Sequence, residues 1–293
     1  MERSFDSVGD VVGPVNAVLL AVLSMLATGF SDFLYKRAIS RSAVPAFFLF
    51  IQSIFFNATT LAFVAYSGHV EISALTILLG ATCASLVYLS VYLFLKSLRE
   101  GQASTNVPVF RLSFIVTAVL AFYFFHESAT YGKILAIGLA TFSILAFSRS
   151  LRITSASLSV LSQLILATII YGLFGFLYKL ATYMGVTPTG ILVVQGASFI
   201  IYAFFIAHRR DAIKWSRNIV VHAPLCGILL SSSYLLLLES LKYGEVSVSF
   251  SIVQLSFMVT SVLAILAWRE KLNVPSILGI VSAVLAVAFF AYV

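Results

Sequence analysis

Apolar runs long enough to cross a membrane recur along the whole chain and are joined by short connections. A transmembrane helix needs about 20 predominantly apolar residues to span the hydrocarbon core of a bilayer. In hydrocarbon every backbone N–H and C=O must be paired inside the protein, so only helices and closed barrels cross it. Barrel strands alternate between apolar and polar residues in segments of about ten, and this pattern does not occur here. The sequence therefore predicts an all-α integral membrane protein.

The amino-acid composition also indicates that most of the chain lies in a lipid bilayer. Apolar residues make up 61% of the 293 positions and charged residues only 10%, whereas a soluble domain carries about 25% charge. The net charge is +7, and the Lys and Arg residues lie mostly at the ends of apolar runs, where they fix the orientation of a helix in the bilayer. We therefore expect the lipid bilayer, and no nucleic acid, as a partner.

The polar residues do not form the constellations that enzymes use. The two cysteines, Cys83 and Cys226, lie inside apolar runs, which favours neither a disulfide framework nor a metal cluster. The sequence shows no pair of intramembrane carboxylates, no histidine cluster, no nucleophile motif and no phosphate-binding glycine loop. We expect no enzymatic activity, no bound metal and no cofactor.

Glycine, proline and charged residues divide the sequence into ten predicted spans. A polar tail, residues 1–14, precedes them, and no connection is long enough to hold a soluble domain. The predicted spans cover residues 15–38, 45–66, 73–98, 103–125, 130–148, 157–181, 188–207, 219–242, 246–268 and 275–293.

The second half of the sequence repeats the first with a constant offset of 143 residues. Charged, amide and small residues match at this offset as well as apolar ones, so compositional bias does not explain the matches. The pairs include Phe33-Leu34-Tyr35-Lys36 with Phe176-Leu177-Tyr178-Lys179, Pro45 with Pro188, Gln52 with Gln195, Ser97 with Ser240, Gly101 with Gly244, Thr117 with Thr260 and Glu127 with Glu270. Such a duplication predicts two similar structural units.

The duplication predicts a first repeat over residues 15–148, a linker over 149–156 and a second repeat over 157–293. Each repeat holds five of the predicted spans. Because five is odd, the second repeat enters the membrane from the opposite side, which makes the two units inverted repeats. Transporters commonly use this arrangement, in which two equivalent halves surround a site near the bilayer midplane.

Basic residues are distributed unequally between the two sides of the membrane. Span parity places thirteen Lys and Arg residues on one side and four on the other. Cytoplasmic connections carry the excess of Lys and Arg, so the count predicts that both termini face away from the cytoplasm. We expect a multi-pass protein of the inner (plasma) membrane.

Several motifs occur in a specific order along the chain. In Gly29–Lys36 a glycine precedes a polar residue, an aromatic residue and later a lysine, and Tyr234–Ser256 joins a tyrosine-glutamate segment to a serine-rich step. Glu127 and Glu270 each follow a predicted span. In order and spacing these features resemble the drug/metabolite transporter superfamily, specifically its ten-helix EamA-type members. Thr28 replaces the tryptophan usual in that family, and the ninth span lacks its common early proline.

The resemblance implies two repeats of five helices and a secondary transporter that moves amino acids or related metabolites, often outward. Its motifs cover nearly the whole chain. It does not by itself name the cargo, so the candidate binding residues come from the polar positions inside the predicted spans.

Arg111 lies eight residues into the predicted span 103–125, and a charge inside the bilayer is costly unless it is paired or faces water. Pro108 precedes it and removes a backbone donor, which can open the helix towards a cavity. Arg111 suits the carboxylate or phosphate of a substrate, or it could form a structural salt bridge. Asp32 is the expected partner, and it could bind an ammonium group, couple transport to a proton or only pair with Arg111.

Gln254 is the repeat mate of Arg111 and shares a polar face with Ser251 in the predicted span 246–268. The two mates are predicted to contribute equivalent positions to one cavity. Alternatively, Gln254 and Ser251 form hydrogen bonds between helices, which membrane proteins use routinely.

Hydroxyl and amide side chains at helical spacing complete the candidate substrate-binding residues. Tyrosine can stack on a ring or contact a cation, although it is also frequent at the membrane interface. The set comprises Ser85, Tyr88 and Tyr92 in the third span, Tyr171 and Tyr178 in the sixth, and the repeat mates Gln52 and Gln195.

These observations favour a secondary transporter that moves a small metabolite through a central cavity by alternating access. The expected cargo is an amino acid, another zwitterion or an organic anion, moved by export, with a proton or an exchanged solute as a coupling partner. The protein would be a monomer or a homodimer. One alternative is a transporter of cationic amines or nucleotide-like solutes, and another is a non-transporting membrane scaffold or lipid-handling protein.

Overall fold

The computed structural model describes residues 14–39, 45–68, 70–100, 103–149, 158–209, 215–268 and 274–292. Within these residues the chain is helical and contains no strand. The polar tail up to residue 13, the linker after Arg149 and Glu270 lie outside the described residues. The helices are α1 (Pro14–Ile39), α2 (Pro45–Ser67), α3 (Ala74–Glu100), α4 (Ala103–Arg111), α5 (Ser113–Phe124), α6 (Tyr131–Arg149), α7 (Leu158–Tyr183), α8 (Pro188–Arg209), α9 (Arg217–Tyr243), α10 (Val246–Gln254), α11 (Ser256–Trp268) and α12 (Val274–Ala291).

Eight stretches of the described residues are long and apolar enough to cross a membrane. Two further apolar segments are shorter, Val109–Phe124 and Tyr131–Ala146. Many large apolar side chains on the outer faces of these helices are exposed, such as Leu61 and Ile77, and acyl chains would cover them in a bilayer. The fold is therefore that of a multi-pass membrane protein.

Two of the predicted spans are interrupted in the middle. The predicted span 103–125 is divided into α4 and α5 at Leu112, and the predicted span 246–268 into α10 and α11 at Leu255. At each break the leucine N–H bonds the carbonyl three residues earlier, at 3.1 Å for Leu112 and 3.0 Å for Leu255, which tightens the turn. Each break divides one predicted span into two helices, although Val246–Leu263 is still long and apolar enough as a whole to cross a membrane. The two breaks are themselves repeat mates.

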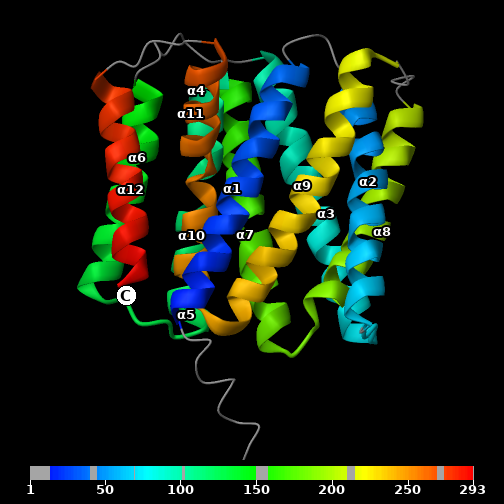
Figure 1. Cartoon of the computed structure of the whole chain (residues 1–293), viewed down its shortest axis with the longest axis horizontal. Coiled ribbons are helices and arrows are strands. Elements are labelled where there is room, and N and C mark those ends of the chain that lie inside the picture. Colours follow the sequence, from blue (N-terminus) through cyan, green and yellow to red (C-terminus); the bar gives the residue numbers. More distant parts are fainter. Residues whose placement is uncertain are drawn as a thin grey trace, which may run out of the picture.

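The helices stand side by side, with α6 and α12 at one end of the row and α2 and α8 at the other (Figure 1). α1 packs antiparallel against α9, since Ser240 Oγ donates to the Ala17 carbonyl at 2.7 Å and Cys226 Sγ lies 3.6 Å from the Ser31 carbonyl. Figure 1 shows the start of α1 and the end of α12 at the same end of the bundle, called the termini side below.

The first helices of the two repeats, α1 and α7, run in opposite directions. Lys179, near the end of α7, donates to the carbonyl of Gly244 at 2.7 Å. Gly244 directly follows α9, whose last turn contacts the start of α1 through Ala17. The end of α7 and the start of α1 therefore lie together on the termini side.

Equivalent hydrogen bonds join the repeats to each other. These bonds occur in two pairs. Within a pair, adding or subtracting 143 from the residue numbers of one bond gives the residues of the other. Ser233 Oγ donates to the Ser24 carbonyl at 3.0 Å and Ser90 Oγ to the Ala167 carbonyl at 2.8 Å, while Thr260 Oγ1 donates to the Gly29 carbonyl at 3.0 Å and Thr117 Oγ1 to the Gly172 carbonyl at 2.8 Å. The repeats are thus related by a pseudo-twofold axis.

Two glycines allow the first helix of each repeat to approach a broken helix of the other. A Cβ on Gly29 would lie 2.5 Å from Val259 Cβ and 2.8 Å from the Ser256 carbonyl oxygen. A Cβ on Gly172, its mate, would lie 2.5 Å from Val116 Cβ. Small residues at such crossings let membrane helices pack closely, here beside the two breaks.

We expect Gly29→Ala and Gly172→Ala each to destabilise the protein by about 1–3 kcal/mol, because the added methyl group overpacks the crossing. Gly138→Ala is the matched control, since a Cβ there meets nothing within 4 Å. Thermal unfolding of the purified protein in detergent measures the effect. An equal loss of stability in the control variant would contradict the close crossing.

Candidate functional site

Arg111 and Gln254 meet at the centre of the bundle. Each is the last residue of a helix that ends at a break, α4 for Arg111 and α10 for Gln254. Arg111 Nη1 donates to Gln254 Oε1 at 3.0 Å. Because the two residues are repeat mates, their contact lies on the pseudo-twofold axis. The two repeat mates are thus in direct contact, whereas their predicted role in lining one cavity stays a prediction.

Asp32 of α1 forms an ion pair with Arg111. Ser256 Oγ also donates to the Asp32 carboxylate, at 3.2 Å, and Ser256 is the first residue of α11, whose N-terminus favours a negative charge. The side chains of Arg111 and Asp32 are 7% and 21% exposed. The ion pair, the hydroxyl and the helix terminus together offset the cost of placing a carboxylate inside the bundle.

The second repeat has no counterpart of Asp32. Its mate is Gly175, where a Cβ would lie 2.8 Å from the ring of Phe250 and 2.8 Å from Thr117 Oγ1. Phe250 is buried and fills the space that a second carboxylate would need. The central cluster is therefore asymmetric, with one positive and one negative charge.

Two buried donors in this cluster have no hydrogen-bond partner among the residues that the structure describes. They are Arg111 Nε and Gln254 Nε2. Leaving a buried donor unsatisfied costs about 1–3 kcal/mol, and more for a charged group. The cluster thus retains the capacity to bind an acceptor oxygen beside the existing ion pair.

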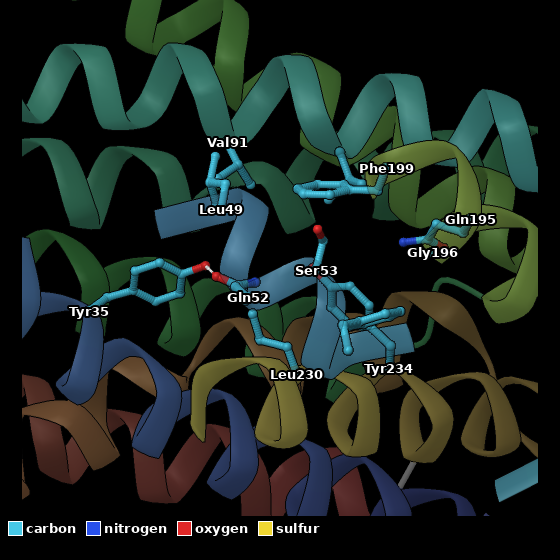
Figure 2. Close-up of a pocket in the computed structure, with 12 residues that line it drawn as sticks. Tyr35, Leu49, Gln52, Ser53, Val91, Gln195, Gly196, Phe199, Leu230 and Tyr234 are labelled. Carbon is cyan, nitrogen blue, oxygen red and sulfur yellow. Dashed lines mark hydrogen bonds between the residues drawn. The ribbon is translucent and has the colours of Figure 1, made fainter. Parts of the chain in front are cut away.

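A cavity lies beside the cluster, between α2, α3, α8 and α9 (Figure 2). Its volume is about 40 Å³, and since one water needs about 10–15 Å³ of such space it holds roughly three waters. The lining residues are Tyr35, Leu49, Gln52, Ser53, Phe56, Val87, Val91, Gln195, Gly196, Phe199, Leu230 and Tyr234. The lining does not include Arg111, Asp32 or Gln254.

This cavity is centred on the pseudo-twofold axis, and we call it the axial cavity. Ten of its twelve lining residues form five pairs of repeat mates. The pairs are Gln52 with Gln195, Ser53 with Gly196, Phe56 with Phe199, Val87 with Leu230 and Val91 with Tyr234. Both repeats therefore contribute equivalent walls to one space.

Gln52 and Gln195 are held in the same way. The Tyr35 hydroxyl donates to Gln52 Oε1, as Figure 2 shows, and the Tyr178 hydroxyl donates to Gln195 Oε1. Tyr178 is the mate of Tyr35. With both amide oxygens engaged, each side chain keeps its Nε2 amino group as a donor, and the nitrogen of Gln195 points into the cavity (Figure 2).

Tyrosines connect the axial cavity with the charged cluster. The ring of Tyr171 packs 4.9 Å from that of Phe110, the residue before Arg111, and its hydroxyl is 3.5 Å from the hydroxyl of Tyr234 in the cavity wall. Tyr35 lies one turn after Asp32 on α1 and lines the cavity. A solute could therefore contact both the ion pair and the cavity once these tyrosines move apart.

The remaining predicted residues lie outside the cluster and the cavity. Tyr88 is buried and packs behind the cavity wall, with its ring 5.2 Å from that of Phe199 and 6.3 Å from that of Tyr92. Ser85 is exposed and donates to a carbonyl of its own helix, α3. Ser251 is buried and bonds the Ser247 carbonyl of its own helix. The structure does not bring Tyr88, Tyr92, Ser85 or Ser251 to the centre.

Sequence reasoning missed several cavity residues. Ser53, Phe56, Gly196, Phe199 and Tyr234 line the space but were not among the candidate binding residues. The repeat offset is the signal that could have identified them. Ser53 and Phe56 lie one and four residues after Gln52, and their mates Gly196 and Phe199 lie at the same spacing after Gln195.

A second set of contacts ties the repeats together on the termini side. Glu127, after α5, accepts the backbone N–H groups of Val246 and Ser247 at 2.8 and 3.1 Å, which caps the N-terminus of α10. Lys133 of α6, whose side chain is 1% exposed, pairs with Glu245. We call Glu127, Lys133 and Glu245 the termini-side clamp. It joins the α5–α6 connection of the first repeat to the α9–α10 connection of the second.

The comparisons with known proteins agree with this arrangement. A model of the EamA-like transporter family matches residues 15–149 and residues 158–292, one match for each repeat. Twenty-eight chains of solved structures also match. One is the crystal structure of a protein of 8% sequence identity, which covers 94% of this chain and 96% of the other with a TM-score of 0.81, a likeness of fold alone. No curated protein matches.

Proposed function

Because the chain belongs to the EamA-like transporter family, as its sequence motifs predicted, we propose that it is a secondary transporter of a small zwitterionic metabolite of the amino-acid class. The cargo passes through the centre of the bundle, between the two repeats. Membership in the family makes the protein a membrane transporter; the class of cargo rests on the chemistry of the central cluster.

The observation that carries the proposal is the pairing of Arg111 with Asp32 beside two unpartnered donors. A zwitterion offers one carboxylate and one ammonium group, so it can replace both partners of the ion pair at once. Its carboxylate would accept from Arg111 and from Gln254 Nε2, and its ammonium group would bind Asp32. A simple organic anion would instead leave Asp32 facing a like charge, which is unfavourable.

Each broken helix pair, α4 with α5 and α10 with α11, counts in this proposal as one crossing. The chain then crosses the membrane ten times, five times in each repeat, and both ends lie on one side. Broken helices near the midplane of transporters present helix ends to charged solutes, and the breaks here lie at Arg111 and Gln254. Rocking of one repeat against the other exposes the centre to alternate sides.

The excess of basic residues on the opposite side supports a termini side that faces away from the cytoplasm; the inner membrane is the proposed location and export the proposed direction. Fusion of a reporter that is active only in the cytoplasm to the C-terminus is expected to give no activity. An active fusion would reverse the proposed orientation and leave the transport proposal unaffected.

Alternating access requires the termini-side clamp to open. We expect Glu127→Ala to favour the open state, because α10 loses two hydrogen bonds to a charged cap, worth about 1–3 kcal/mol. A cysteine at Val248, buried just inside the clamp, would then react with a membrane-impermeant maleimide about tenfold faster. The background chain carries alanine at Cys83 and Cys226.

Glu239→Ala is the matched control for this experiment. Glu239 lies near the end of α9 on the same side, but it pairs with Lys242 of its own helix and does not join the repeats. An equal acceleration of labelling in both variants would show that surface charge, and not the clamp, controls access.

Ligand binding tests the proposed cargo class. Thermal unfolding of the purified protein is measured with norleucine, with pentylamine and with hexanoate. Norleucine carries both charges, pentylamine has the same chain with only the ammonium group, and hexanoate has it with only the carboxylate. Ligands that bind only the folded state raise its melting temperature, and we expect the largest rise with norleucine. A rise with pentylamine alone would favour the cationic-amine alternative.

A further inference from the structure

The axial cavity offers donors but few acceptors to a ligand. The oxygens of Gln52 and Gln195 are occupied by the hydroxyls of Tyr35 and Tyr178. The Nε2 groups of both glutamines have no hydrogen-bond partner among the described residues. Ser53 Oγ donates to the carbonyl of Phe50 at 2.7 Å, which leaves three hydroxyl oxygens, those of Ser53, Tyr35 and Tyr234, as the weak acceptors among the polar lining side chains.

The twelve described residues that line the axial cavity include no carboxylate and no basic side chain. A cation in this cavity would face the partially positive Nε2 groups of two glutamines and no negatively charged side chain. Burying an unpaired charge in such a space is strongly unfavourable. A carbonyl, ester or ether oxygen would accept from one or both amides instead.

The rest of the wall is apolar and largely aromatic. Phe56 and Phe199 form one pair of mates. In another pair, the second repeat contributes Tyr234 and the first repeat the smaller Val91. Phe56 and Tyr234 contact each other at a ring centroid distance of 6.0 Å. These rings favour the apolar part of a ligand.

From these features we infer that the axial cavity binds the side chain of the cargo and selects an uncharged side chain that carries a hydrogen-bond acceptor. This inference rests on the proposed function, since the zwitterionic head must occupy Arg111 and Asp32. Tyr35 lines the cavity one turn after Asp32 on α1, and the Tyr171 hydroxyl lies 3.5 Å from that of Tyr234 in the cavity wall, so one small molecule can occupy both places. The cavity widens on binding, because its present volume of about 40 Å³ holds only about three waters.

The experiment is uptake into proteoliposomes of three amino acids that share a head group and have side chains of similar length. Norleucine has an apolar side chain, glutamate γ-methyl ester has a neutral acceptor, and lysine has a cation. We expect the wild type to transport the ester at least about tenfold faster than lysine at low concentration, since an unmade buried hydrogen bond and an unpaired charge both oppose lysine.

Variants of the two glutamines assign the effect to the cavity. Gln52→Met and Gln195→Met remove one donor each at nearly constant volume, so the preference for the ester over norleucine is expected to fall about fivefold. Gln195→Glu adds a negative charge and is expected to move the preference towards lysine. Gln163→Met is the control, because Gln163 lies on α7 and does not line the cavity. If Gln195→Glu does not fold, the two uncharged methionine variants still test the role of the glutamine donors.

The outcomes separate the two proposals. Transport of the ester and lysine at equal rates, or unchanged ratios in both methionine variants, would overturn the inference about the cavity and leave the proposed transport standing. Transport of none of the three compounds by well-folded wild-type protein would overturn the proposed function itself.

Discussion

Replacing Arg111 with methionine is expected to reduce norleucine transport about a hundredfold, because a hydrogen bond from a buried charge contributes about 1.5–3 kcal/mol. The cargo carboxylate loses the guanidinium group and keeps only the neutral amide of Gln254, which Arg111 contacts at 3.0 Å. Initial rates of uptake into proteoliposomes, normalised to the amount of inserted protein, measure the effect.

The same variant also leaves Asp32 without its counter-charge, so its fold needs a control. Removal of one partner of a buried ion pair costs about 3–5 kcal/mol, and the 21% exposure of Asp32 reduces this cost. The double variant Arg111→Met with Asp32→Leu removes both charges and is expected to recover most of the stability without recovering transport. Recovery of transport in the double variant would show that the pair serves only to hold helices together.

Replacing Asp32 with asparagine is expected to have the second large effect, a change of charge preference. The ammonium group of a zwitterion loses its partner, while Arg111 is released to bind a carboxylate. We expect norleucine binding to weaken about a hundredfold from the loss of a charge-assisted bond, and hexanoate binding to strengthen. Ligand-induced shifts in the melting temperature of the purified variant measure both.

A different pair of results would reverse the assignment. If Asp32→Asn abolishes transport while Arg111→Met leaves it unchanged, the cargo is a cationic amine and the arginine is structural. If both variants leave transport unchanged, the solute does not pass the central ion pair.

The internal repeat made the centre of the site predictable from sequence. The offset of 143 residues identifies Gln254 as the mate of Arg111, and mates on a pseudo-twofold axis must come together. The cost of a charge inside a membrane pointed to Arg111, and Asp32 was its expected partner. Gln52 and Gln195 were found in the same way, as amides that recur at one offset.

Pro108 indicated a local opening of the predicted span 103–125, but the position of the breaks was not predictable, because neither break has a glycine or a proline at the turn itself and the mate of Pro108 is Ser251. Leu112 and Leu255 are ordinary helix-forming residues. The breaks lie where α1 and α7 cross at Gly29 and Gly172, so tertiary packing and not local preference sets their place. A single-sequence pattern of apolar residues contains no signal for such a crossing.

The shape of the axial cavity was also beyond sequence reasoning. Tyr88 and Tyr171 both occur on polar helix faces, yet Tyr88 packs behind Phe199 while Tyr171 contacts the hydroxyl of Tyr234. Helical spacing gives the face of a residue but not which neighbouring helix that face meets. The asymmetry between Asp32 and Gly175, filled by Phe250, likewise depends on packing between repeats.

Counterflow tests the central claim most directly. Proteoliposomes loaded with unlabelled norleucine are placed in a trace of labelled norleucine, with no ion gradient and no membrane potential. If a site between the repeats opens alternately to each side, the label accumulates transiently inside wild-type vesicles and does not do so with Arg111→Met. Equal equilibration of label with and without unlabelled norleucine inside, or accumulation that survives Arg111→Met, would contradict a carrier that works through this ion pair.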